Sequence, residues 1–273
     1  MAFNKDNLII DRAIKGSMKN KTTSAVLWTV DQIKDPSIEC AGETVYALDS
    51  VGAKIAGFER SKDCTLTFSN SVFNLSLAAA QFGSTKSVAS SSNLITVPKY
   101  ETIVLGAVGG TVNDTITLEE TPKTALTKIY KIDTDGSILE EIVVGVTATT
   151  QFSITEKIIT LPTTPVSGAY TATTRFGIWY DYECSGSEGL GAVKVSNNAS
   201  EFPASGIFEL EVLFADICDP STKYHGFVVF GNAKLSSSTT INLTTEIQQN
   251  VQIDCMQDYC DAERTLFDII VPE

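Results

Sequence analysis

The sequence predicts a mainly β protein, built as a β-sandwich or as a subunit of a ring-forming β-barrel, with one or two short helices. Thr, Val, Ile and Ser dominate the chain, apolar and polar residues alternate over many short stretches, and Gly, Asn, Asp and Pro bound these stretches. The 273 residues, 43% of them hydrophobic and 19% charged, are enough for one large β domain or two smaller ones.

The predicted elements are short and follow one another along the whole chain. Helices are few: residues 75–82 contain three successive alanines and are the best candidate, and residues 5–14 are a weaker one. The other periodic stretches are predicted strands: 25–30, 44–48, 54–59, 65–69, 102–108, 115–119, 126–132, 138–146, 153–161, 170–175, 177–182, 206–214, 225–230, 239–254 and 266–271.

A Ser-rich segment divides the chain. Residues 84–93 hold Ser or Thr at six of ten positions, which is typical of a linker or a long loop. The strands that follow are about ten residues apart, and Asp135-Gly136 predicts a tight hairpin turn between two of them. We therefore expect a small immunoglobulin-like β-sandwich at 93–175, inserted into a core domain made of residues 1–92 and 176–273.

The longest periodic signal lies in residues 239–254, where apolar residues on one face alternate with polar residues on the other. A single strand of this length would span about 50 Å, far more than the usual strand. Residues 206–214 repeat the pattern. The polar faces of the two strands carry four carboxylates: Glu209, Glu211, Glu246 and Asp254.

This pattern has two interpretations. In the first, a long two-layer sandwich exposes its outer sheet to bulk water. In the second, the polar face lines a hydrated channel within an assembly. Long strands expose unpaired edges, and a closed ring of protomers would pair those edges between neighbours.

The acidic side chains are concentrated in the last third of the chain. The net charge is 20 − 33 = −13. Residues 1–92 contribute 10 − 9 = +1, residues 93–175 contribute 6 − 9 = −3, and residues 176–273 contribute 4 − 15 = −11. Because affinity for nucleic acids comes mainly from Lys and Arg, the chain is not expected to bind DNA tightly.

The order of these elements resembles that of bacteriophage tail tube proteins, the major tail protein family. In the C-terminal part, the strand with Phe208 and Leu210 precedes a turn at Asp219-Pro220, then residues 225–235, then the long alternating strand. In the N-terminal part, residues 52–68 and the Ala-rich stretch follow a similar order. The resemblance covers roughly residues 20–90 and 176–273.

The resemblance implies a structural virion protein without catalytic residues. Such proteins form hexameric rings that stack into a hollow tube, through which DNA passes during genome ejection. It implies contacts with further copies and with other tail proteins, transient passage of DNA that does not stick, and a place in the virion tail after assembly in the host cytoplasm. Glu209, Glu211, Glu246 and Asp254 would then face an acidic lumen.

Two further features follow from the same resemblance. Residues 93–175 lie outside it, as do the immunoglobulin-like domains with which some family members decorate the tube exterior. The near-neutral first 60 residues would supply contacts between rings, through an N-terminal arm and a loop at residues 31–42.

Composition argues against an enzyme and against a bound cofactor or metal. The single histidine, His225, removes most zinc, triad and acid–base schemes. Cys218, Cys255 and Cys260 lack zinc-site spacing, and the six cysteines are expected to be free thiols. Asp133 and its neighbours lack the ligand order of a calcium loop, and the Gly-rich stretch 186–191 lacks the Lys of a phosphate-binding loop.

A sugar hydrolase would need two carboxylates across a cleft, usually beside aromatic platforms. Trp179 stands in a strand between Phe176, Ile178 and Tyr180 and is interpreted as a core residue. The alternative to a tail tube is therefore a β-sandwich adhesion or surface-binding module that holds its partner through the loops of 94–175. The chain contains no apolar segment long enough to cross a membrane.

Overall fold

The computed structural model describes residues 7–164, 168–187, 189–217, 220–242, 249–258 and 263–272. The protein is mainly β, as predicted, and α1 (Leu75–Gln81) is the one helix in these ranges. That helix is too short to cross a membrane. The chain forms two compact units, a core unit of Met1–Lys86 and Val195–Glu273 and an inserted unit of Ser87–Lys194. These boundaries lie outside the expected 93 and 175, so the inserted unit is longer at both ends.

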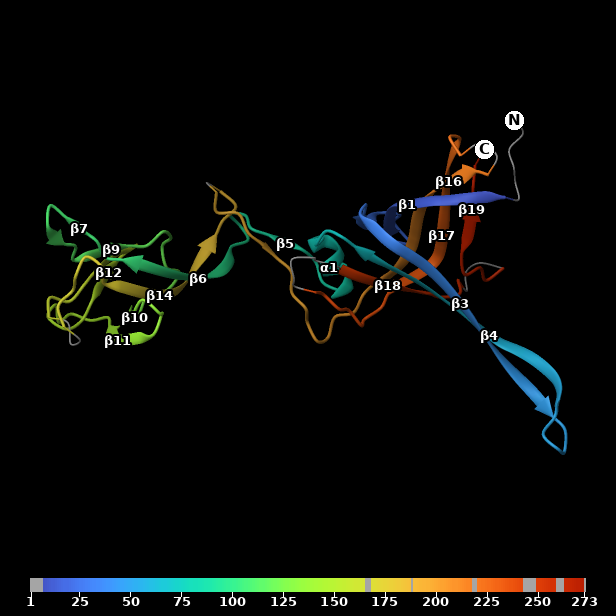
Figure 1. Cartoon of the computed structure of the whole chain (residues 1–273), viewed down its shortest axis with the longest axis horizontal. Helices are drawn as coiled ribbons and strands as arrows, with labels where there is room; N and C mark the ends of the chain where they lie inside the picture. Colours follow the sequence, from blue (N-terminus) through green and yellow to red (C-terminus); the bar gives the residue numbers. More distant parts are fainter. Residues whose placement is uncertain are drawn as a thin grey trace. The chain divides into compact units, whose positions relative to one another are not determined.

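The core unit is built on one large antiparallel sheet (Figure 1). Its strands follow the order β2-β1-β16-β17-β18-β4-β3, and β19 also pairs with β17. The strands are β1 (Leu8–Lys19), β2 (Val26–Val30), β3 (Ile33–Leu48), β4 (Lys54–Asn70), β16 (Ser205–Asp216), β17 (Lys223–Leu235), β18 (Gln249–Cys255) and β19 (Asp268–Ile270).

The sheet curls around a buried aromatic cluster without closing. Only two residues separate β2 from β3 in the sequence, although these strands end the order on opposite sides. The ring of Phe208 on β16 is fully buried and lies 5.5 Å from that of Trp28 on β2 and 6.2 Å from that of Phe68 on β4. The two ends therefore share one core, yet within the described residues no ladder joins them.

Helix α1 is fixed to the sheet by polar side chains. Asn74 caps it by accepting hydrogen bonds from the N–H groups of Ser76 and Leu77. The Nε2 of Gln81 donates to the carbonyl of Asn250, and the Nε2 of Gln249 donates to the Oε1 of Gln81. The Oε1 of Gln249 in turn accepts from the N–H of Asn74, so this fully buried amide joins both ends of the helix to β18.

Three sequence-based expectations for the core unit are wrong. The described part of the expected helix at 5–14, from residue 7 onward, is not helical, because β1 begins at Leu8 and pairs with β16. The expected loop at residues 31–42 is mostly the start of β3. Residues 239–254 are not one strand, because Ile241 and Gln249 pair with each other in an antiparallel bridge and β18 begins only at Gln249.

The inserted unit is a small two-sheet sandwich. One sheet has the order β11-β10-β14-β6 and the other the order β12-β13-β9, and their inner faces share a core that includes Phe152, Phe176 and Ile178. The strands of the two sheets are β6 (Ile95–Val104), β9 (Thr115–Thr117), β10 (Lys128–Ile132), β11 (Ile138–Val143), β12 (Ser153–Thr155), β13 (Ile158–Thr160) and β14 (Arg175–Cys184). Short pairs complete the unit: β5 (Ser87–Val88) with β15 (Val193–Lys194), and β7 (Ala107–Val108) with β8 (Thr111–Val112).

Its strand order is related to that of an immunoglobulin domain. Pairing β9 with β13, and β10 with β14, gives the B–E and C–F pairs of that fold. The position beside the F strand is taken by β6, the first long strand of the unit in sequence. The predicted turn joins β10 to β11: the N–H of Gly136 donates to the carbonyl of Asp133, and Gly136 has φ +87°, in the left-handed region that glycine favours.

We predict that Gln249→Leu lowers the free energy of unfolding by about 2–4 kcal/mol, because it removes the hydrogen-bond partners of Asn74 and Gln81 at a buried site. Gln252→Leu on the exposed side of the same strand is the control, with an expected change within about 0.5 kcal/mol. Urea denaturation measures both. Equal effects of the two substitutions would show that the Gln249 amide does not fasten α1.

Candidate functional site

Three of the four carboxylates expected to face a lumen lie on the polar face of the core sheet. On β16, the partly exposed Glu209 and Glu211 alternate with the buried Phe208 and Leu210. On β18, Asp254 is partly exposed beside the buried Ile253 and Cys255. Glu246 lies outside the described residues.

Two of these carboxylates are paired with basic side chains. The Nζ of Lys19 on β1 lies 2.6 Å from Glu209, and the Nδ1 of His225 on β17 lies 2.8 Å from Glu211. Asp254 instead accepts a hydrogen bond from the amide of Gln252. The local field of this face is therefore weaker than its count of carboxylates indicates, because the charge of Glu209 is opposed at contact distance.

The second candidate feature is a hairpin arm, residues 41–63, formed by the outer parts of β3 and β4 (Figure 1). The ladder between β18 and β4 ends at the pair Cys255 and Cys64, and beyond it β4 pairs only with β3 in the described chain. Each side of the arm extends about 25 Å from that point. A two-stranded hairpin of this kind is marginally stable in water without a further partner.

The arm exposes apolar side chains on both of its faces. Val51 at the tip is 86% exposed, and large apolar residues on both strands are about half exposed or more. Such a patch on an unsupported hairpin is typical of a protein contact surface. The exposed large apolar residues of the arm are Tyr46, Leu48, Val51, Ile55 and Phe58.

Two strand edges of the core sheet are also open. The order of strands ends at β2 on one side and β3 on the other, and neither has a further ladder partner among the described residues. Val26 and Leu27 on β2 are exposed at such an edge. Unpaired N–H and C=O groups along an edge can pair with a strand of another molecule.

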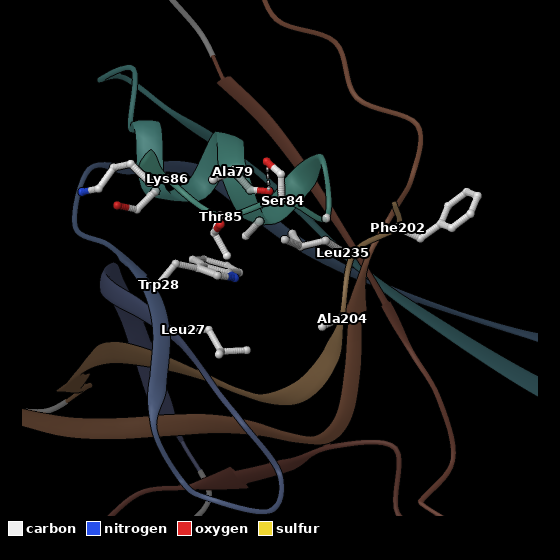
Figure 2. A pocket seen from close by; sticks show the side chains of 12 residues that line it. Leu27, Trp28, Ala79, Ser84, Thr85, Lys86, Phe202, Ala204 and Leu235 are labelled. Atoms are coloured by element: carbon white, nitrogen blue, oxygen red, sulfur yellow. Dashed lines mark hydrogen bonds between the residues drawn. The ribbon is translucent and has the colours of Figure 1, made fainter. Parts of the chain in front are cut away.

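An apolar hollow of about 420 Å³ lies beside α1 (Figure 2). Trp28 and Leu27 line it from β2, Ala79 lines it from the helix, and Lys86 is its one charged lining residue. Gly83 closes the helix at φ +70°, and a Cβ there would meet the backbone of Phe202 at 2.4 Å. The lining offers contact surface but no carboxylate, histidine or thiol for acid–base or nucleophilic chemistry.

A row of three thiols marks the base of the arm. Cys64 on β4 is directly opposite Cys40 on β3 and Cys255 on β18. The Sγ atoms of Cys40 and Cys64 are 3.2 Å apart, and both are free thiols. Burial and the neighbouring thiols raise the pKa of Cys64 well above its usual range, and burial raises the pKa of Cys255 to about 11.

The sequence predicted the two strands of the arm but not that they leave the sheet. The sequence does contain a sign of this. Residues 64–68 alternate between apolar and polar, but in the part of the strand that precedes Cys64 apolar residues occur on both faces. The thiol row was also missed, since residues 40, 64 and 255 meet only through strand register. Within the described ranges, no group of three or more His, Cys, Asp or Glu side chains could hold a metal ion.

Comparison with known proteins adds no family. The sequence matches no protein-family model and no curated protein.

We predict that iodoacetamide at pH 8 alkylates Cys40 in the native protein but leaves Cys64 and Cys255 unmodified. Only the thiolate reacts, and a raised pKa keeps both buried groups as thiols at this pH. Mass spectrometry of peptides measures labelling, and unfolding in denaturant with a reductant should expose both sites. Native labelling of Cys64 as fast as that of the exposed Cys40 would contradict the register of the thiol row.

Proposed function

We propose that the protein is a self-assembling structural protomer, of the kind that forms stacked hexameric rings in a phage tail tube. The hairpin arm is the observation that carries this proposal. It exposes five large apolar side chains on a two-stranded extension, and a neighbouring protein would bury them.

We expect the neighbouring protein that buries the arm to be a second copy of this chain. A surface that is complementary to a different surface of the same chain produces head-to-tail contacts, which close into rings or continue as filaments. The arm tip and the hollow beside α1 are complementary in character. The tip carries the apolar Val51 and, two residues before it, the acidic Asp49, and the apolar hollow has Lys86 as its one charged lining residue. The open edges at β2 and β3 allow the sheets of neighbouring copies to pair around a ring.

The charge of the core unit suits a conduit for DNA. Its 13 basic and 21 acidic residues give 13 − 21 = −8, and the inserted unit holds 7 − 12 = −5. A tube with this excess repels phosphates, so DNA would slide through it without binding. In this proposal, Glu211 and Asp254 contribute to the wall more than Glu209, whose charge Lys19 opposes. The other expected contacts are with further tail proteins, in a virion assembled in the host cytoplasm.

Purified protein should form six-fold rings or hollow tubes in negative-stain electron microscopy. Val51→Asp and Phe58→Ser should shift it to monomers by placing polar groups in the arm contact, with circular dichroism unchanged. Val146→Ser, at a fully exposed residue of the inserted unit, is the control and should assemble normally. A wild-type chain that stays monomeric at high concentration would contradict assembly and favour a surface-binding module.

Assembled tubes should not bind DNA, and Glu211→Lys combined with Asp254→Lys should make them bind it. Each substitution adds a cation to the polar face, so retention of DNA at 50 mM salt should rise roughly tenfold or more and disappear at high salt. Co-sedimentation measures the effect. The double variant Asp114→Lys and Glu156→Lys, at exposed residues of the inserted unit, is the control because it changes the net charge by the same amount. Equal DNA retention by the two double variants would remove these residues from the lumen.

A further inference from the structure

The inserted unit exposes a cluster of aromatic rings that includes Trp179, which the sequence pattern had placed in the core. Trp179 on β14 points to the outer face of the sheet and is 50% exposed, while its neighbours Ile178 and Tyr180 are buried. Tyr100 on β6 is directly opposite Trp179 in the register and is 47% exposed. The interpretation of Trp179 as a core residue is therefore wrong, because alternation along β14 turns it away from the core.

The rings are held in place by one another and by the strands below. Tyr100 stacks on Trp179 with centroids 4.3 Å apart, and Tyr130 on β10 meets Trp179 edge-on at 5.4 Å. The hydroxyl of Thr102 donates to that of Tyr100. Gly177 leaves room for the cluster, because a Cβ there would lie 3.2–3.3 Å from Tyr100 and Trp179. The aromatic surface is thus preorganised.

The sheet opens beside this cluster. Strand β14 pairs with β6 along its whole length, from Arg175 to Cys184, but with β10 only from Arg175 to Gly177. From Ile178 onward β10 and β14 diverge, and the N–H of Lys123 closes the far end by donating to the carbonyl of Asp181. The divergence creates a groove of about 550 Å³, within the size range of small-molecule sites.

Polar groups surround the aromatic rings in this groove. Asp181, Lys128, Thr124 and Thr127 line it together with the three rings. The Nζ of Lys128 forms an ion pair with Glu141 at 2.8 Å. The carboxylate of Asp181, by contrast, forms no hydrogen bond or ion pair with another described residue. The groove therefore combines exposed ring surface with an available acceptor and several hydroxyl and ammonium donors.

We propose that this groove binds a pyranose unit of a glycan. A pyranose ring presents C–H groups on its flat face, which suit the negative face of an aromatic ring, and hydroxyls around its rim, which need both donors and acceptors. The groove supplies both kinds of contact side by side. Asp181 is its one carboxylate, so the arrangement supports binding and not the two-carboxylate hydrolysis of a glycosidase. This inference does not depend on assembly of the core unit.

Two other roles for the rings are distinguishable. Cross-strand aromatic pairs stabilise sheets, which accounts for Tyr100 and Trp179 as a pair but not for the open groove or the available Asp181 carboxylate. A proline-rich peptide would also stack on aromatic rings, but in grooves between ring faces. Here Tyr130 meets Trp179 at 79°, so the rings form a corner.

The test is binding of the whole protein to an array of pyranose oligosaccharides, followed by calorimetry with the oligosaccharide retained. We expect at least one oligosaccharide to bind, with affinity reduced at least about tenfold by Trp179→Ala and by Asp181→Asn. Asp181→Asn keeps the aromatic cluster, which separates binding from folding. Val104→Ala, at an exposed residue of β6 outside the groove, should bind as the wild type does.

Three outcomes would overturn the proposal. No oligosaccharide binds, or Trp179→Ala and Asp181→Asn bind the retained oligosaccharide as tightly as the wild type does, or the groove binds a polyproline peptide and no oligosaccharide. Thermal unfolding of each variant shows whether a loss of binding reflects a loss of structure. If Trp179→Ala unfolds the inserted unit, the affinities of Asp181→Asn and Trp179→Phe for the retained oligosaccharide are compared with that of the wild type instead.

Discussion

The core unit depends on the burial of Phe208. Its ring contacts aromatic side chains from β2, β4 and β17, and these contacts hold a seven-strand path in a tight curl. A closed barrel would have no free edges, whereas this curl brings its two ends into one core and leaves each edge unpaired in the described chain. The arm continues one of those edge strands beyond the core. The same curl that satisfies the apolar interior thus leaves backbone and side-chain surface that a neighbouring chain could satisfy.

The charge of the core unit acts differently at single carboxylates and over the unit as a whole. Lys19 opposes the charge of Glu209 at contact distance, and the ring of His225 lies 2.8 Å from Glu211, so the two acidic residues on β16 do not act as a row of free charges. The excess of eight negative charges on the core unit is not removed by such pairs. Repulsion of phosphates would therefore come from the unit as a whole more than from individual side chains.

Sequence reasoning recovered the features that depend on local chemistry. The alternation of Phe208 and Leu210 with Glu209, the turn at Gly136 and the helix after Asn74 all follow from neighbours in the chain. It failed where distant residues decide. The alternation of residues 239–254 fits one strand or two with a reversal between them, and only pairing of Ile241 with Gln249 separates these. For Trp179 the signal was available, because the buried Ile178 and Tyr180 place their common neighbour on the opposite face.

The way the chain enters and leaves the inserted unit explains how the two units can differ so much in their surfaces. β5 and β15 pair as Val88 with Val193 and Ser87 with Lys194, so the two connections to the core unit start side by side. Because the two ends of the inserted unit are adjacent, the core unit only has to bridge a short distance between them, however many residues the inserted unit contains. Each unit has its own aromatic or aliphatic core, around Phe208 in one and around Phe152 and Phe176 in the other. An exposed aromatic groove can therefore be maintained on the inserted unit without any change in the packing that shapes the arm.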